Sequence, residues 1–140
     1  AVGEEEVGAG ECCGGSVREG GLPCHIKGAC DGDIAVVRVS TIKPGAMQGF
    51  LAAVAAHKAW YRDHGFKDNI LVTAKIMVRD PKSGTMSYSD TEVLTYHVRP
   101  PAGAQVREKR DAGWDAYVKM YQDSSSIKTE YLTCMPKLVP

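Results

Sequence analysis

The sequence has no hydrophobic run long enough to span a bilayer, and its single asparagine, Asn69, lacks the Ser or Thr that N-glycosylation requires two positions later. Motifs of the common enzyme classes are also missing, among them G-x-S-x-G, H-E-x-x-H and the P-loop. Gly8-Ala-Gly10 has no third glycine and no preceding strand, so it is not a dinucleotide site. We therefore expect no membrane-spanning helix in this sequence, and the reaction, if there is one, stays unspecified.

Charge is balanced overall but divided unevenly along the chain. The sequence has 17 basic and 17 acidic residues, yet residues 1–33 hold seven acidic residues against Arg18 and Lys27. Residues 34–140 hold fifteen basic residues interleaved with ten acidic ones, and the densest basic cluster is Arg107-Glu-Lys-Arg110. Because no basic patch stands apart from acids, we expect no nucleic-acid partner.

The chain divides into an N-terminal extension, residues 1–32, and a domain, residues 33–140. The first 33 residues contain no aromatic residue and hold nine of the fifteen glycines and four of the five cysteines. Such a segment cannot bury a core of its own. We expect an acidic arm held against a basic domain; the alternatives are a mobile tail and an arm that reaches a neighbouring subunit of a larger assembly.

Four cysteines of the extension, Cys12, Cys13, Cys24 and Cys30, lie in a Gly-rich stretch where disulfides are the usual staples. A metal site with His25 as a spare ligand is the competing interpretation, but the ligand spacing does not suit zinc. Free thiols are the third possibility. We favour disulfides, no metal, and an oxidising location. A chain that starts with Ala fits a periplasmic or secreted protein after leader removal, and it fits simple Met excision equally well.

Cys134 lies far from the other cysteines, near the end of the chain. We expect it to be a buried free thiol, because a strand cysteine behaves as a small hydrophobic residue. The alternative is a bridge to the extension that leaves one of Cys12 and Cys13 unpaired.

Hydrophobic periodicity predicts two helices and four strands in residues 33–140. The first helix is expected to begin next to Pro44 and end before Gly65, with one apolar stripe that includes Phe50 and Leu51. Pro100-Pro101 should end the third strand. The predicted elements are strand Ile34–Ile42, helix Ala46–His64, strands Ile70–Arg79 and Met86–Arg99, helix Ala104–Gln122, and strand Ile127–Met135.

This order predicts an α+β ferredoxin-like βαββαβ fold, with a four-stranded antiparallel sheet and two helices on one face. The other sheet face would be bare. We expect Leu71 and Met77 to lie on it, beside Lys75 and Arg38, and a second copy of the chain to cover it.

The domain resembles the dimeric α/β-barrel superfamily. The resemblance lies in the element order, the strand leading into Lys43-Pro44-Gly45, the helix that carries His57 and Trp60, and the aromatic second helix with Trp114. It implies two such sheets paired as a homodimeric barrel. Members include cofactor-independent monooxygenases, isomerases and stress-responsive proteins, and we expect no cofactor.

The candidate ligand-binding residues are Arg38, His57, Trp60, Lys75 and His97, with His57 and His97 as the weak catalytic candidates. A histidine beside an aromatic ring could orient a phenolic or quinone-like ligand or act as a base near neutral pH. The plainer interpretation is a boundary His57 packed on Trp60 with one nitrogen in water.

Two further polar groups are weaker candidates. His64 lies two helical turns after His57 on the predicted first helix. Asp90 and Glu92 are two residues apart and therefore share one face of a predicted strand. Carboxylates near a hairpin are usually just solvated.

Three functions remain open from the sequence. The first is a non-enzymatic or small-ligand-binding dimeric barrel of the periplasm or extracellular space. The second is an accessory subunit attached through residues 1–32, and the third is a cofactor-independent monooxygenase or isomerase acting on an aromatic molecule.

Overall fold

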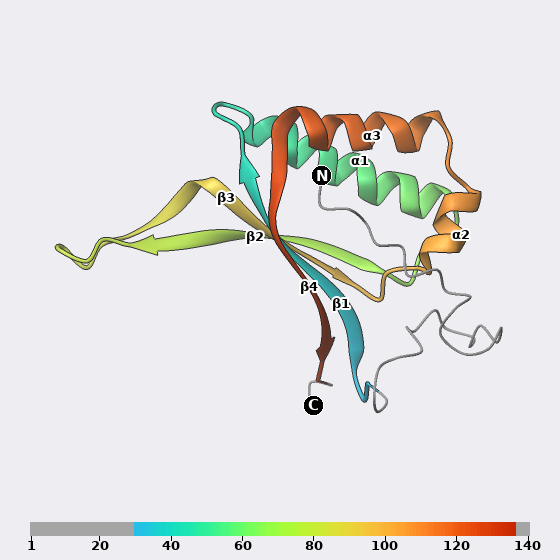
Figure 1. Cartoon of the computed structure of the whole chain (residues 1–140), viewed down its shortest axis with the longest axis horizontal. Coiled ribbons are helices and arrows are strands. Elements are labelled where there is room, and N and C mark those ends of the chain that lie inside the picture. Colours follow the sequence, from blue (N-terminus) through green and yellow to red (C-terminus); the bar gives the residue numbers. More distant parts are fainter. Residues whose placement is uncertain (1–29, 137–140) are drawn as a thin grey trace.

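The computed structural model describes residues 30–136, which form one antiparallel sheet with helices on a single face (Figure 1). The strand order β2-β3-β1-β4 is that of a ferredoxin-like fold, as predicted. No helix in this part of the chain has the length and apolarity needed to cross a membrane. The elements are β1 (Asp33–Ile42), α1 (Met47–Asp63), β2 (Ile70–Arg79), β3 (Met86–Val98), α2 (Gly103–Glu108), α3 (Ala112–Ser124) and β4 (Ser125–Met135).

Helix α1 is bounded by two glycines in the left-handed region. Gly45 has φ 71° in a turn closed by the Ala46 amide donating to the Lys43 carbonyl, so Pro44 belongs to this turn and not, as predicted, to the first helical turn. At the other end Gly65 has φ 86°, and a Schellman pair of hydrogen bonds closes the helix. Both positions require a residue without a Cβ.

The single helix predicted over Ala104–Gln122 is two helices, α2 and α3. The chain leaves helical geometry after Glu108, and Asp111 then caps α3 by accepting a hydrogen bond from the Trp114 amide. Such a cap needs an extended residue before the helix, which a continuous helix could not supply. The prediction missed this start signal because apolar spacing runs on across the break.

The helices cover the sheet face that carries Leu71, contrary to our prediction. Leu71 is 8% exposed and packs in a core with Phe50 and Val54 of α1, whereas Ile70 and Val72 are 47% and 45% exposed. Neighbouring strand residues point to opposite faces, so β2 presents its most apolar face away from the helices. Leu51, predicted in the buried stripe, is 36% exposed.

The sheet face away from the helices is broad and apolar. Strand register brings side chains from all four strands together on it, because directly paired residues share a face. Ile70 and Val72 of the edge strand β2 are exposed on this face, and so is Tyr131 of the opposite edge strand, β4. This surface, called the open face below, contains Ile70, Val72, Leu94, Tyr96, Val37, Val39 and Tyr131.

Beyond a bulge between Lys75 and Met77, β2 and β3 continue as a two-stranded arm that projects past the helices (Figure 1). Met77 therefore lies on the arm, exposed, rather than in the centre of the open face. The Lys75 ammonium lies 5.0 Å from the ring centre of Tyr88, which is also part of the arm.

A disulfide joins Cys30 to Cys134, with the two Cα atoms 5.7 Å apart. Cys134 is therefore not the free thiol that we predicted. The alternative kept open above, a bridge from Cys134 to the extension, is the one that forms. The sequence did not identify Cys30 as the partner, because the two residues are 104 positions apart and the pairing of β1 with β4 brings them together. The expected bonding of Cys12, Cys13 and Cys24 lies outside the described residues.

Candidate functional site

His57 of α1 and His97 of β3 meet between the helices and the sheet. Their side chains are 7% and 8% exposed, and their ring centres are 5.5 Å apart. Helix α1 places His57 one turn after Val54, on its buried stripe, and strand register pairs His97 with Leu71 on the covered face. The structure thus brings together the two histidines that the sequence singled out, from elements 40 residues apart in the chain.

Each histidine of this pair has one neutral hydrogen-bond partner. The His57 Nδ1 lies 3.0 Å from the hydroxyl of Tyr121. The His97 Nε2 lies 2.8 Å from the Asn69 Oδ1, and the Asn69 amide nitrogen donates to the carbonyl of Phe66, which fixes the amide orientation. Since that oxygen can only accept, His97 carries its proton on Nε2 and keeps a lone pair on Nδ1.

Tyrosine rings enclose His57. Tyr117 stacks on it with ring centres 4.6 Å apart and planes 10° from parallel, and Tyr61 meets it edge-on at 4.6 Å. The Tyr117 hydroxyl is buried and, alone among the buried side-chain polar atoms of the described residues, has no hydrogen-bond partner. Buried hydroxyls normally have one, so this atom marks an unused hydrogen-bonding position.

Burial keeps both histidines neutral. It lowers the pKa of His57 to about 3, with further lowering by His97 and Arg38, and it lowers the pKa of His97 to about 4, again with a contribution from Arg38. Burial also raises the pKa of Tyr117 and of Tyr121, so their hydroxyls stay protonated. At neutral pH this cluster therefore offers uncharged donors and acceptors.

Arg38 supplies the positive charge next to this cluster. It lies on β1 two residues from Val36, the strand partner of His97, so it shares the covered face with His97. Its guanidinium forms an ion pair with Glu130 of β4, and the two side chains are 40% and 46% exposed. Arg38 and the group of His57, His97, Tyr61, Tyr117 and Tyr121 are called the layer site below.

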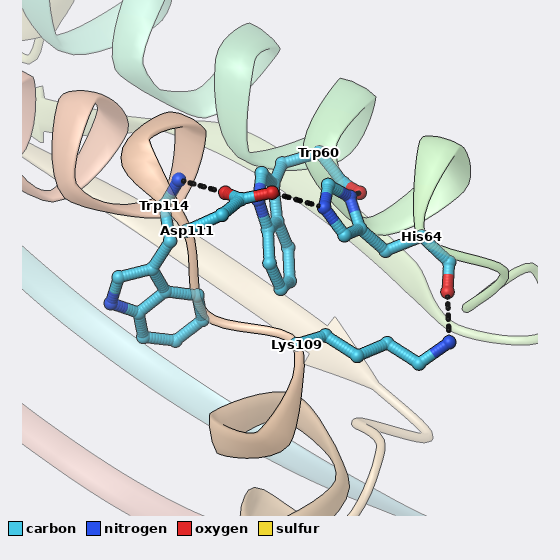
Figure 2. A network of polar contacts seen from close by, with 5 residues as sticks. All are labelled: Trp60, His64, Lys109, Asp111 and Trp114. Atoms are coloured by element: carbon cyan, nitrogen blue, oxygen red, sulfur yellow. Dashed lines mark hydrogen bonds and ion pairs between the residues drawn. The ribbon is translucent and has the colours of Figure 1, made fainter.

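A second histidine centre lies at the C-terminal end of α1 (Figure 2). The two nitrogens of His64 lie 2.6 Å from the Trp60 carbonyl and 2.6 Å from the Asp111 carboxylate. Asp111 also accepts from the Trp60 indole at 2.7 Å and caps α3 through the Trp114 amide. Lys109 donates to the His64 carbonyl. This group ties α1 to the start of α3.

The histidine of this second centre has a raised pKa, whereas the two histidines of the layer site have lowered pKa values. The hydrogen bond to Asp111 raises the pKa of His64, helped by the Trp60 carbonyl, and opposed by burial and by Lys109. Hydrogen bonds from Trp60, Trp114 and His64 lower the pKa of Asp111. Both His64 nitrogens lie within hydrogen-bonding distance of acceptors, an arrangement that favours the protonated ring.

The other predicted site residues lie at the border of the layer site or away from it. Trp60 stacks on His64 at 4.0 Å and also packs against Tyr61 and Tyr117, with ring centres 5.6 and 6.0 Å apart. The ring stacked on His57 is that of Tyr117, so the predicted packing of His57 on Trp60 is wrong. Lys75 lies toward the arm. Glu92 pairs with Lys128, and Asp90 is exposed.

Sequence reasoning missed several polar members of the two centres, among them Tyr117, Tyr121, Asn69 and Asp111. Tyr117 and Tyr121 carried a usable signal, since they lie three and seven residues after Trp114 in the predicted second helix, a spacing that we interpreted only as core packing. Asp111 carried a helix-start signal but none for its contact with His64, and Asn69 carried none for its contact with His97, because these partners are 47 and 28 residues away.

The layer site presents uncharged hydrogen-bonding groups among packed aromatic rings. Among residues 30–136, no group of three or more His, Cys, Asp or Glu side chains could hold a metal ion. The Tyr117 hydroxyl, neutral imidazoles and a guanidinium are groups that orient oxygen atoms of a planar ligand.

No protein-family model matches the sequence, and no curated protein matches it. Among solved structures the chain is similar to SnoaB, a cofactor-independent oxygenase from Streptomyces nogalater, with a TM-score of 0.49 and 14% sequence identity over 78% of this chain and 98% of SnoaB. A likeness at this level concerns the course of the chain and says nothing of activity.

Proposed function

We propose that the protein is a homodimeric α/β barrel that binds a small planar molecule at the layer site. The observation that carries this proposal is the Tyr117 hydroxyl, which is buried without a partner beside the stacked ring of His57. Leaving a buried hydroxyl unpaired costs about 1–3 kcal/mol. A ligand oxygen that accepts its hydrogen bond would recover this energy.

Binding is favoured over proton abstraction by the charge state of the histidines. A general base works best when its pKa lies near the working pH, whereas burial holds the pKa of His57 at about 3 and that of His97 at about 4. Both are weak bases at pH 7. The alternative, a cofactor-independent monooxygenase or isomerase, would need the bound molecule to raise one of these pKa values.

The test uses the full chain and 2-naphthol, a neutral planar phenol, as the probe in isothermal titration calorimetry. We expect saturable binding, weakened about tenfold by Tyr117→Phe, which corresponds to one hydrogen bond. Tyr88→Phe, which removes an exposed hydroxyl on the arm, is the matched control and should bind as the wild type does. Equal affinity of the Tyr117 and Tyr88 variants, or no saturable binding, would contradict the proposal.

The homodimer is supported by the open face. Exposed apolar patches of this breadth usually mark an interface, and a second copy of the same sheet would bury Ile70, Val72 and Tyr131. We expect Val72→Asp to yield a folded monomer in analytical ultracentrifugation. Leu71→Asp, which puts the charge in the core, should unfold the chain instead. A dimeric Val72→Asp protein would argue against pairing through this face.

The Cys30–Cys134 bond supports an oxidising location, periplasmic or extracellular. Alkylation of the natural protein without reductant, followed by mass measurement, should label at most three of the five cysteines. Five labels would remove this support. Attachment to other subunits through residues 1–32 stays a prediction, since that segment lies outside the described residues.

A further inference from the structure

We propose that the molecule bound at the layer site is a planar organic anion, and that its anionic group replaces Glu130 as the partner of Arg38. This inference rests on the proposed ligand site and adds the charge of the ligand and its place of entry, the β4 edge. The chemical class is a conjugated carboxylate, phenolate or enolate.

The layer site carries a positive charge that its interior does not balance. The guanidinium of Arg38 influences the pKa of every other member of the site, and in each case it lowers the pKa. The remaining electrostatic influences on these groups come from one another, and none comes from a carboxylate. With the histidines neutral, an anion entering the site meets one cation and several uncharged hydrogen-bonding groups.

The carboxylate that pairs with Arg38 stands outside this interior. Glu130 lies on the edge strand β4, opposite Arg38 in the strand register, and its side chain is about half exposed. Its neighbour on the same face, Leu132, is also exposed. The helices therefore leave this edge of the sheet uncovered, which gives a ligand direct access to Arg38.

Exchange of partners at Arg38 costs little. Ion pairs between half-exposed side chains contribute little to stability, because water and salt screen them. An anion that also stacks among tyrosine rings and accepts from Tyr117 would hold the guanidinium in a less solvated place, where charged hydrogen bonds are stronger. Glu130 then acts as a competitor that the ligand displaces.

A matched pair of probes separates charge from shape. Naphthalene-2-sulfonate keeps its negative charge at all working pH values, and naphthalene-2-sulfonamide is its neutral counterpart of nearly the same size. Titration calorimetry on the full chain should give the sulfonate at least tenfold tighter binding at low salt. This preference should shrink as salt rises, because salt screens charges.

Three variants test the exchange itself. Glu130→Gln removes the competing charge and should tighten sulfonate binding at least threefold without changing sulfonamide binding. Arg38→Gln should abolish the preference for the sulfonate. Arg38→Lys, which keeps the charge but loses the planar fork, should retain part of it. Circular dichroism and thermal melting check that each variant is folded, and the sulfonamide affinity gives an internal standard.

The outcomes distinguish this inference from the proposed function. Equal affinity for the two probes, or weaker sulfonate binding in Glu130→Gln, would overturn the inference and leave ligand binding intact. A sulfonate preference that survives Arg38→Gln would also overturn it, since the charge recognised would lie elsewhere. If neither probe nor 2-naphthol binds, the proposed function and the inference fail together.

Discussion

Two histidine centres on the same helix have opposite charge. His57 lies on α1 and His64, seven residues later, caps its C-terminal end. Burial lowers the pKa of His57 to about 3, whereas the hydrogen bond to Asp111 raises the pKa of His64. His57 meets only uncharged partners, a tyrosine hydroxyl and aromatic rings. His64 meets a carboxylate. The comparison shows that the pKa of a histidine in this protein depends on its hydrogen-bond partner and on how deeply the side chain is buried.

The difference assigns different roles to the two centres. His64 has hydrogen bonds at both ring nitrogens and no free position for a ligand, so it serves to hold α1 against the start of α3. The layer site has an unused hydroxyl and an exchangeable cation. Of the two centres, it is the layer site that is suited to binding.

The largest expected effect is acid destabilisation through the buried pair. The folded-state pKa values of His57 and His97, about 3 and about 4, lie below the unfolded value of 6.5. Between these limits the unfolded state binds more protons, so the free energy of unfolding falls as pH falls from about 6.5. At about 1.4 kcal/mol per pKa unit the loss amounts to several kcal/mol.

Urea unfolding at pH 7 and at pH 4.5 measures this loss. In the double variant His57→Gln/His97→Gln, the part of the pH dependence that comes from the pair should disappear, even though the variant is less stable at pH 7. A wild-type protein that is equally stable at both pH values would show that the pair is not buried as described.

A smaller effect separates two tyrosines of the layer site. Tyr121→Phe removes the hydroxyl bonded to His57 and should destabilise the protein by about 1 kcal/mol, whereas Tyr117→Phe removes an unpaired hydroxyl and should leave stability unchanged or raise it. Thermal and urea unfolding of the two variants provide the comparison. A clear loss of stability in Tyr117→Phe would mean that its hydroxyl already has a partner in the protein.

The smallest effect concerns the second centre. Asp111→Asn keeps a good helix cap but removes the charge, so the pKa of His64 should fall toward 6.5. In the wild type, the stabilisation from His64 is fully present below pH 6.5 and is lost as pH rises through the raised folded pKa. NMR titration of the ring measures this. Asp115→Asn, which removes a nearby carboxylate bonded to Arg110, is the control and should leave the pKa of His64 unchanged.

The fold was predictable because periodicity and turn residues mark the elements. The bounds of β2 came out as predicted, and α1 within one residue at each end. The prediction of which face of β2 the helices cover was wrong. Both faces carry apolar residues, such as Leu71 on one and Ile70 on the other, and we assumed that the more apolar face lies against the helices. That side is the open face, where we propose that a second sheet packs.

The candidate site was predictable in part. His57 and His97 stood out as rare titratable residues on buried elements. Their charge, and the choice between Trp60 and Tyr117 as the ring beside His57, depend on how α3 packs against α1. No spacing within one element encodes that packing.

The most direct test follows the histidine rings by NMR while naphthalene-2-sulfonate is added to the full chain at pH 7. The account predicts that the ring signals of His57 and His97 shift and saturate together, at the affinity that calorimetry gives, while the signals of His64 stay in place. If binding leaves His57 and His97 unmoved, or moves His64 alone, then the ligand does not bind between the helices and the sheet.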